Sequence, residues 1–353
     1  MSSITWRCQK NNNMNRAYVT AIAYHLPAQV LDNEEINRVH PEWSADKISA
    51  KTGILERHIA APGEFSSDLA VEAAEALFRD FHIDRAVVDY VLLCTQSPDY
   101  FLPTTSCLIQ DRLRLGKGIG ALDFNLGCSG FVYGLGLAKG LIATGQAKNV
   151  LLITAETYSK FIHKDDKSNK TLFGDAAAAA LVSSERREGW GGEILDFCYG
   201  TDGSGYGHLV VKNGGMRNRY GTGIDVLHEE TGAFVRNDDY LYMDGKEIFN
   251  FTAFQVPALV RDTLEKNRFD AEAIDLFVFH QANEYMLQTI RKRCGIPEER
   301  FFVHLRTCGN TVSSTIPIAL THALEKKAFG EGNKVLIAGF GVGLSMGATI
   351  LQF

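Results

Sequence analysis

Short, continuous hydrophobic runs alternate along the chain with longer segments of helical spacing. YVLLC (90–94) and LFVFH (276–280) have the length of strands, and amphipathic segments precede them at 66–81 and 250–267. Apolar runs of this kind between helices are typical of parallel strands that are covered on both faces. The pattern therefore predicts an α/β protein.

The same pattern occurs twice. IDRAVVDYVLL (83–93) and FDAEAIDLFVF (269–279) share the spacing of their aspartates and of the apolar run, with starts 186 residues apart (269 − 83). GQAKNVLLIT (145–154) and GEGNKVLIAG (330–339) match in the same way, 185 residues apart (330 − 145). Because two unrelated matches have nearly one offset, we predict a duplicated architecture.

The duplication predicts the domain organisation. Residues 1–15 begin with the polar stretch MSSITWRCQKNNNMN, which lacks the apolar segment of a secretory signal, and we expect a disordered leader there. One α/β half is predicted at 16–185 and a second at 186–353, each with a central sheet, packed about a pseudo-twofold axis. We expect surface loops at 165–170, which is charged, and at 199–223, which is rich in glycine and mobile.

Composition excludes several classes of function. The net charge of −6 argues against nucleic-acid binding. The uncharged stretch at 335–353 contains four glycines, so it predicts a strand, a glycine loop and a strand rather than a membrane helix. The seven cysteines are widely spaced without a CxxC pair, which argues against a disulfide framework and a metal site. We expect a cytoplasmic protein with no membrane partner.

Three residues with reactive or hydrogen-bonding side chains follow predicted strands. Cys128 comes after ALDFNL (121–126), His280 ends an apolar run, and Asn310 comes after FFVHLRTCG (301–309). Ligands of α/β sheets bind beyond the carboxyl ends of the strands, and equivalent ends of two packed halves can face one cleft. The three side chains are therefore the candidate catalytic residues.

The surroundings of Cys128 fit a nucleophile. A predicted helix at 129–145 starts beside it and would favour a thiolate, and an imidazole such as that of His280 would pair with the thiolate. Backbone N–H groups in the turn flanked by Gly127 and Gly130 would hold an oxyanion.

Other interpretations stay open from the residues alone. A cysteine at a helix start is usually a buried, inert thiol, a histidine at a strand end is often a core residue, and an asparagine after glycine is a common turn former. The order Cys, His, Asn also occurs in papain-like proteases, but their CGSCW-type segment is absent here.

Six motifs in one order resemble ketoacyl-ACP synthase III, one of the thiolase-like condensing enzymes, from about Ala17 to Phe353. The motifs are TGILERHIAAPGE (52–64), DFNLGCSGFVYGL (123–135), FGDAAAAALV (173–182), HQAN (280–283), GNT (309–311) and GFGVGLSMGA (339–348). The resemblance implies a thiolase-like fold, in which duplicated α/β halves form five layers, α-β-α-β-α.

The resemblance also implies a reaction. Cys128 would accept an acyl group from acyl-CoA or acyl-ACP, and malonyl-ACP would then decarboxylate. His280 and Asn310 would donate hydrogen bonds to the malonyl thioester carbonyl, and the backbone N–H groups of Cys128 and Val342 would form the oxyanion hole. Fatty-acid, specialised lipid or polyketide biosynthesis is the implied setting, without metal or cofactor.

Further positions are assigned by the resemblance alone. Leu102 and Phe340 would line the acyl pocket. Arg291, Lys292 and Arg293 would dock the acidic acyl carrier protein. A homodimer is implied, with the segment around Leu102 near the partner's pocket.

The region that would bind CoA or pantetheine departs from the family pattern. It would comprise Lys47, Lys51, Lys167 and Asn283. Lys47 and Lys167 stand where the family commonly has the tryptophan and arginine that stack on adenine. We therefore expect that the aromatic stacking is lost and that the positive charge remains, as in a specialised relative.

Two other functions fit the same residues. One is an acyltransferase that passes the acyl group from Cys128 to another nucleophile without decarboxylation. The other is a non-catalytic subunit of a condensing complex, although such subunits tend to lose the nucleophile or the histidine.

Overall fold

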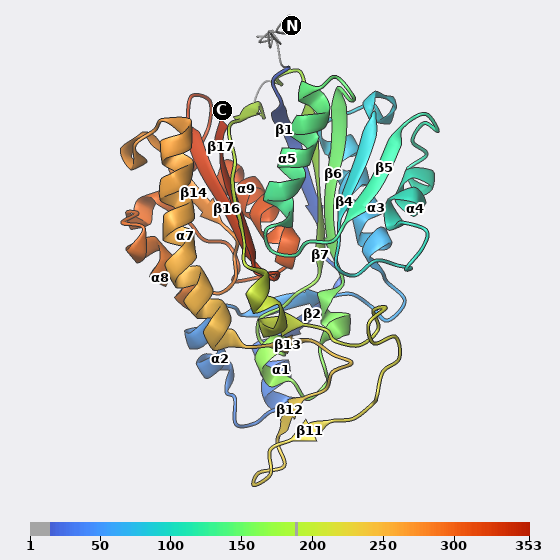
Figure 1. Ribbon diagram of the computed structural model, residues 1–353, viewed down its shortest axis with the longest axis vertical. Helices are drawn as coiled ribbons and strands as arrows, with labels where there is room; N and C mark the ends of the chain where they lie inside the picture. The colour runs from blue at the N-terminus through green and yellow to red at the C-terminus, as the bar shows by residue number, and fades with distance from the viewer. Residues whose placement is uncertain (1–14, 188–189) are drawn as a thin grey trace, which may run out of the picture.

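The computed structural model describes residues 15–187 and 190–353 (Figure 1). Residues 1–14 of the predicted leader lie outside the described residues. In the described part of the chain, the main sheet has eleven strands, and its two ends repeat one pairing scheme.

The first set of strands comes from the N-terminal half of the chain. β4 (Tyr90–Cys94) lies between β5 (Gly120–Phe124) and β6 (Asn149–Glu156), and all three are parallel. β7 (Ala176–Ser183) pairs antiparallel with β6, and β1 (Tyr18–His25) pairs antiparallel with β7.

The second set repeats these directions. β14 (Leu276–Phe279) lies parallel between β15 (Phe301–Phe302) and β16 (Lys334–Gly341), and β17 (Ser345–Gln352) is antiparallel to β16. β8 (Gly192–Ile194) and β9 (Cys198–Thr201) pair antiparallel with β17, and β8 also pairs with β1. The matched sequences thus lead into equivalent strands, β4 with β14 and β6 with β16.

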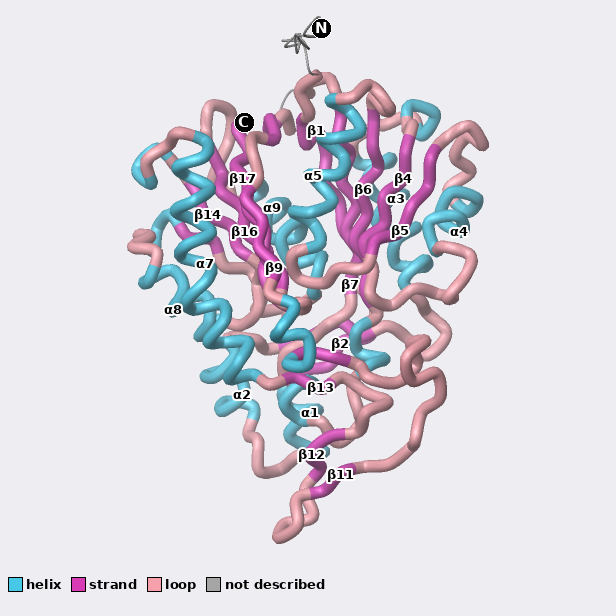
Figure 2. The backbone as a smooth tube through the Cα atoms, in the orientation of Figure 1, coloured by secondary structure: helices cyan, strands magenta, loops and turns pink. Residues whose placement is uncertain are grey.

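Helices cover the strands in three layers, as predicted (Figures 1 and 2). α3 (Ser66–Asp80) and α4 (Thr105–Arg112) pack on the outer face of the first set. α5 (Gly130–Ala143) and α9 (Thr315–Glu325) lie between the sets, and α7 (Gly245–Asn267) and α8 (Glu284–Arg293) lie outside the second. The molecule therefore has the α-β-α-β-α order of a thiolase-like fold.

Burial explains why the strand sequences are continuous hydrophobic runs. Every residue of β7, with the sequence AAAAALVS, is buried. β7 lies in a sheet with helices on both faces, and its five alanines let those helices approach closely. α5 is apolar on most sides because it packs between the two sets of strands.

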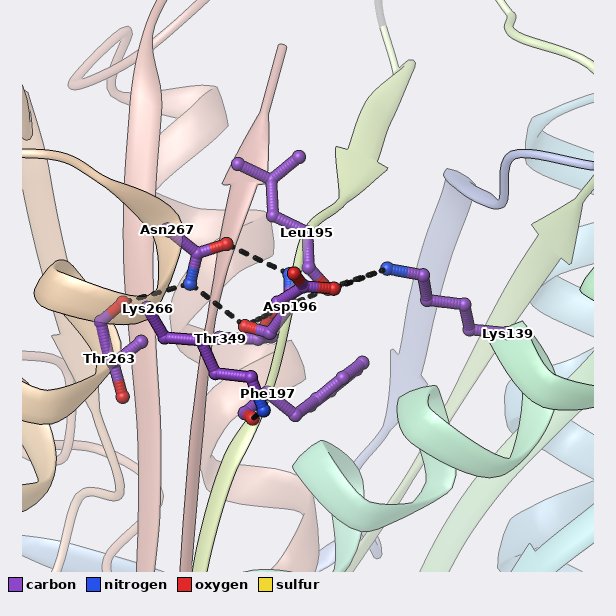
Figure 3. A network of polar contacts seen from close by, with 8 residues as sticks. All are labelled: Lys139, Leu195, Asp196, Phe197, Thr263, Lys266, Asn267 and Thr349. Atoms are coloured by element: carbon purple, nitrogen blue, oxygen red, sulfur yellow. Dashed lines mark hydrogen bonds and ion pairs between the residues drawn. The ribbon is translucent and has the colours of Figure 1, made fainter. Parts of the chain in front are cut away.

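A short segment between β8 and β9 ties the two halves together (Figure 3). Lys139 of α5 donates from Nζ to the Leu195 carbonyl at 2.8 Å, and Lys266 of α7 donates to the Phe197 carbonyl at 2.8 Å. Asn267 forms two hydrogen bonds with the backbone of Asp196, at 2.9 and 3.0 Å. The segment 195–197 therefore joins α5 of the first half to α7 of the second.

A smaller region caps the carboxyl ends of the parallel strands (Figure 1). Its elements are β2 (Gln29–Asp32), α1 (Asn33–Val39), α2 (Ala45–Thr52), β3 (Glu56–Ile59), α6 (Lys167–Lys170), β10 (Leu209–Val210), β11 (Val226–Leu227), β12 (Phe234–Arg236) and β13 (Tyr242–Met243). The cap covers the edge where the sequence predicts the site.

Two predicted loops are partly wrong. The segment 165–170 includes the short helix α6, because the Asp166 carboxylate caps it by accepting from the Asn169 N–H. The segment 199–223 includes most of β9, whose backbone pairs with β17, and β10. The strand–loop–strand prediction for 335–353 is confirmed by β16 and β17. None of the helices in the described ranges has the length and apolar character to cross a bilayer.

Candidate active site

Cys128 lies in the tight connection between β5 and α5. Its side chain is buried, and the Gly130 N–H donates to the Gly127 carbonyl at 2.8 Å to close the turn. Gly341, at the end of β16, faces the sulfur: a Cβ atom at this position would lie 2.8 Å from both Cβ and Sγ of Cys128. A glycine is therefore required at 341 by close packing.

Burial governs the state of the thiol. It raises the pKa of Cys128 to about 12, while backbone hydrogen bonds from Val342 and from Cys128 itself act in the opposite direction. The resting sulfur is therefore a neutral thiol, and the two N–H groups expected to form an oxyanion hole are directed at it.

His280 follows β14 and is buried. Its backbone N–H donates to the Ala338 carbonyl at 2.8 Å, and its Nδ1 lies 2.7 Å from the Thr315 hydroxyl oxygen. Burial lowers the pKa of His280 to about 3. Burial thus keeps both Cys128 and His280 uncharged in the resting protein, and the pairing of the His280 imidazole with a Cys128 thiolate stays a prediction.

Asn310 is held by backbone contacts on both sides. Its N–H donates to the Leu172 carbonyl at 2.9 Å, and its carbonyl accepts from the Gly174 N–H at 3.0 Å. The side-chain Oδ1 accepts from the Val312 N–H at 2.9 Å. This contact fixes the side-chain amide and leaves its NH₂ group as the donor for a ligand.

The three predicted residues share neighbouring elements. The end of β16 contacts two of them, since Ala338 bonds to His280 and Gly341 packs on Cys128. The Asn310 loop connects to His280 through Thr315, whose hydroxyl lies 3.1 Å from the Val312 carbonyl. The structure thus brings Cys128 and His280 to β16 and joins the Asn310 loop to His280 through Thr315.

The two predicted acyl-pocket residues have different surroundings. Phe340 is buried, and its ring is edge-on to that of His280, with the ring centroids 5.7 Å apart. Leu102 is 83% exposed, next to the exposed Tyr100 and Phe101, in the loop between β4 and α4. Leu102 therefore does not line an enclosed pocket within a single chain.

The predicted lysines gather around one indole ring. The Nζ atoms of Lys47, Lys51 and Lys167 lie 5.6, 5.2 and 6.0 Å from the centroid of the Trp43 ring. Lys167 also pairs with Glu42 at 2.7 Å. The region therefore contains an aromatic ring although position 47 is a lysine, because the loop before α2 brings Trp43 to it from four residues upstream. The loss of aromatic stacking on adenine stays a prediction.

Asn283 caps α8 next to this region. Its Oδ1 accepts from the Met286 N–H at 2.9 Å. The end of α2 packs on the same helix start, because a Cβ atom at Gly53 would collide with the Glu284 side chain. The lysine region and the loop of His280 therefore meet where α2 contacts α8.

The three predicted docking residues are not equivalent. The Arg291 side chain is only 12% exposed and donates to Gln288 Oε1 at 2.8 Å and to the Ile296 carbonyl at 3.1 Å. Lys292 is exposed, and the Arg293 guanidinium lies 4.6 Å from the Phe254 ring centroid. Arg291 thus stabilises its own helix end, and the exposed basic surface consists of Lys292 and Arg293.

Sequence reasoning missed Trp43, Thr315 and Glu156. Glu156 is fully buried at the end of β6 and contacts both loops beside Cys128. The sequence does contain a signal for Glu156, because a carboxylate at the end of the apolar run NVLLITAE is unusual in a buried strand.

Comparisons with known proteins agree with this geometry. Models of 3-oxoacyl-[acyl-carrier-protein (ACP)] synthase III and of its C-terminal part match residues 122–203 and 264–353. A curated relative, beta-ketoacyl-[acyl-carrier-protein] synthase III of Oleidesulfovibrio alaskensis, is 34% identical over 96% of this chain and 99% of its own length.

Solved structures give the same result. A crystal structure of 3-oxoacyl-(acyl-carrier-protein) synthase III is 48% identical, with a TM-score of 0.91 over 96% of this chain and 100% of that chain. The synthase III of Thermus thermophilus is 34% identical, with a TM-score of 0.81 over 95% of this chain and 99% of that chain. The chain therefore belongs to the 3-oxoacyl-[acyl-carrier-protein] synthase III family of acyltransferases, condensing enzymes of fatty-acid biosynthesis.

Proposed function

We propose that Cys128 accepts an acyl group from a thioester and that the acyl group then condenses with the carbanion formed by decarboxylation of malonyl-ACP. The observation that carries this proposal is the close packing of Gly341, next to Val342, on the buried Cys128 sulfur, which is consistent with the lowering of the Cys128 pKa by the backbone N–H groups of Val342 and Cys128. A carbonyl carbon bonded to this sulfur would have its oxygen within reach of both donors.

The first step exchanges one thioester for another. The Cys128 sulfur attacks the acyl carbonyl, the bond to the donor's thiol breaks, and the proton of Cys128 finishes on the departing thiol. Because burial keeps the resting thiol neutral, the attack has to coincide with loss of this proton. The N–H groups of Val342 and Cys128 stabilise the tetrahedral oxyanion.

In the second step, His280 and Asn310 act as hydrogen-bond donors. The malonyl thioester carbonyl accepts from both side chains, and the enolate that forms as CO₂ leaves is stabilised by them. The enolate carbon attacks the acyl carbonyl on Cys128, the carbon–sulfur bond breaks, and a 3-oxoacyl thioester is released. The departing Cys128 sulfur then takes up one proton from water and returns to the neutral thiol. A low pKa keeps His280 a neutral donor throughout the physiological pH range.

Substrates of this kind match the basic surfaces. Trp43 with Lys47, Lys51 and Lys167 presents an aromatic face and positive charge for the nucleotide and phosphates of CoA. Lys292 and Arg293 would attract acidic acyl carrier protein. No metal or cofactor takes part in the proposed steps.

We also propose a homodimer in the cytoplasm. In one chain Tyr100, Phe101 and Leu102 form three consecutive exposed apolar side chains. A second copy would cover them and could take Leu102 into its acyl pocket. The same condensation would also serve polyketide or specialised lipid biosynthesis, and we propose these as more specific settings for the enzyme.

Intact-protein mass spectrometry tests the first step. Native protein and the variant Cys128→Ala are incubated with a panel of acyl-CoA and acyl-ACP donors. We expect a mass gain of one acyl group in the native protein only. Release of CO₂ on addition of malonyl-ACP then separates condensation from simple acyl transfer. A folded native protein that no donor acylates would contradict the proposal and favour the non-catalytic subunit.

A further inference from the structure

Glu156 is a buried carboxyl group that the proposed steps do not use. It ends β6 and has no exposed surface. Its oxygens accept from the Gln96 N–H at 3.0 and 3.1 Å, from the Ser97 hydroxyl at 3.0 Å and from the Ser313 hydroxyl at 3.4 Å. Within the described residues it forms no ion pair.

The groups that contact Glu156 belong to the two loops that flank Cys128. On one side, a Cβ atom at Gly127 would lie 2.5 Å from Gln96 Oε1 and 2.6 Å from Val342 Cγ1. Gln96 and Val342 thus both pack against Gly127, in the turn of the nucleophile.

The other loop carries Asn310. Ser313 follows Asn310 by three residues, and a Cβ atom at Gly130 would lie 3.5 Å from the Ser313 Cβ. Ser313 therefore packs on the start of α5 at Gly130, two residues after Cys128. A single carboxyl group connects both loops.

The charge state of Glu156 matters because of its neighbours. Burial raises the pKa of Glu156 to about 8, while its hydrogen bonds from Gln96, Ser97 and Ser313 act against burial. The ionisable groups that face it are Cys94, Cys128, Tyr158 and Asp175, all of them acids. A negative charge on Glu156 raises the pKa of Cys128 further.

We infer that Glu156 is a positioning residue of the condensing reaction. As a neutral carboxyl group, it holds the Gln96 and Ser313 loops against the Cys128 turn. Once ionised, it opposes negative charge on the Cys128 sulfur. The inference rests on the proposed function. Both proposed steps develop negative charge at this turn, so ionised Glu156 slows them.

The pH dependence has a definite sign. Below the pKa of Glu156 the carboxyl group is neutral, and the fraction of Cys128 present as thiolate rises tenfold per pH unit, as for an isolated thiol. Above that pKa Glu156 becomes charged, and the thiolate fraction of Cys128 then rises less than tenfold per pH unit. A bend therefore appears in the pH profile of thiol reactivity.

Alkylation of Cys128 by iodoacetamide measures this bend without any substrate. The rate at the Cys128 peptide is followed by mass spectrometry from pH 6.5 to 10 in the native protein, in Glu156→Gln and in the control Asp175→Asn. We expect the bend in the native protein and in Asp175→Asn. In Glu156→Gln, the logarithm of the alkylation rate should rise linearly with pH. At the alkaline end this rate should exceed the native rate roughly tenfold for each unit by which the Glu156 charge raises the pKa of Cys128.

Each outcome is decisive. A native profile without a bend overturns the inference even if Glu156→Gln fails to fold, and so does a bend that persists in folded Glu156→Gln. Because alkylation requires neither an acyl donor nor malonyl-ACP, failure of the proposed function would leave this result unaffected. Where condensation is measurable, its alkaline decline should move to higher pH in Glu156→Gln.

Discussion

The Nδ1 atom of His280 lies 2.7 Å from the hydroxyl oxygen of Thr315. The same hydroxyl lies 3.1 Å from the Val312 carbonyl, in the loop that follows Asn310. The hydroxyl donates its one proton to the Val312 carbonyl, so in the resting protein it accepts from Nδ1–H of the neutral imidazole. A donor at Nε2, which the malonyl carbonyl requires, forms when the hydroxyl turns to donate to Nδ1, so Thr315 links the protonation of His280 to the Asn310 loop.

Replacement of Thr315 by valine removes this hydrogen bond and keeps the side-chain volume. We expect malonyl decarboxylation to slow by roughly fivefold to tenfold, since one hydrogen bond contributes about 1 kcal/mol. Acylation of Cys128 should change little. The control Thr315→Ser keeps the hydroxyl and should retain the native rate, and equal loss in both variants would show that the hydroxyl is not the cause.

Gly341 is required because a larger residue would leave no room for the sulfur of Cys128. In Gly341→Ala the new Cβ would lie 2.8 Å from Sγ of Cys128, closer than side chains pack. We expect acylation to fall by at least tenfold and stability to fall by roughly 1–3 kcal/mol. Both are read from the rate of acyl-adduct formation and from denaturant unfolding.

Gly140 of α5 provides the matched control for this substitution. A Cβ atom there meets no other atom within 4 Å. Gly140→Ala should therefore keep the acylation rate and stabilise the helix by up to about 1 kcal/mol. Equal rates in Gly341→Ala and Gly140→Ala would rule out steric contact with the sulfur.

Trp43 tests how the acyl donor binds. In Trp43→Ala the aromatic face between Lys47, Lys51 and Lys167 is lost. We expect KM for acyl-CoA to rise by about 5- to 30-fold, as for a lost contact of 1–2 kcal/mol, with kcat nearly unchanged. The control is Lys326→Ala, in which a lysine over a different ring, that of Phe302, is removed. An unchanged KM in Trp43→Ala would mean that CoA does not contact this region.

The exposed basic residues of α8 test carrier docking. Lys292→Glu and Arg293→Glu should raise KM for malonyl-ACP several-fold at low salt, with a smaller effect at high salt because the attraction is screened. KM for malonyl-CoA should not change. Arg291→Ala should lower the free energy of unfolding instead, because the nearly buried Arg291 side chain forms hydrogen bonds to Gln288 and Ile296 that the variant loses.

The sequence predicts the layers of the fold for a physical reason. Strands covered on both faces, such as β7 and β14, are almost wholly buried, and this requirement is visible as continuous apolar runs. His280 directly follows such a run, whereas Cys128 follows the half-buried strand β5 and Asn310 lies in the loop after the short strand β15. Each of the three strands lies in a parallel set of one sheet, so the expectation that these residues lie at one edge follows from strand direction.

The remaining features depend on loop geometry and on assembly. Trp43 reaches the lysines only through the path of the chain before α2, and the Asn310 loop brings Thr315 to His280. β9 is defined by backbone pairing with β17, which leaves no hydrophobic pattern in CYGT. The predicted pocket role of Leu102 requires a second copy of the chain, which a sequence pattern does not describe.

A single-turnover experiment tests the central claim most directly. Native protein is loaded with an acyl group on Cys128, freed of donor and mixed with malonyl-ACP, and CO₂ and the 3-oxoacyl thioester are quantified together. We expect both products in equal amounts, together with loss of the acyl adduct. Variants at His280 and Asn310 should carry the adduct but form neither product. Disappearance of the adduct without release of CO₂ would contradict the account and would identify the protein as an acyltransferase that does not condense.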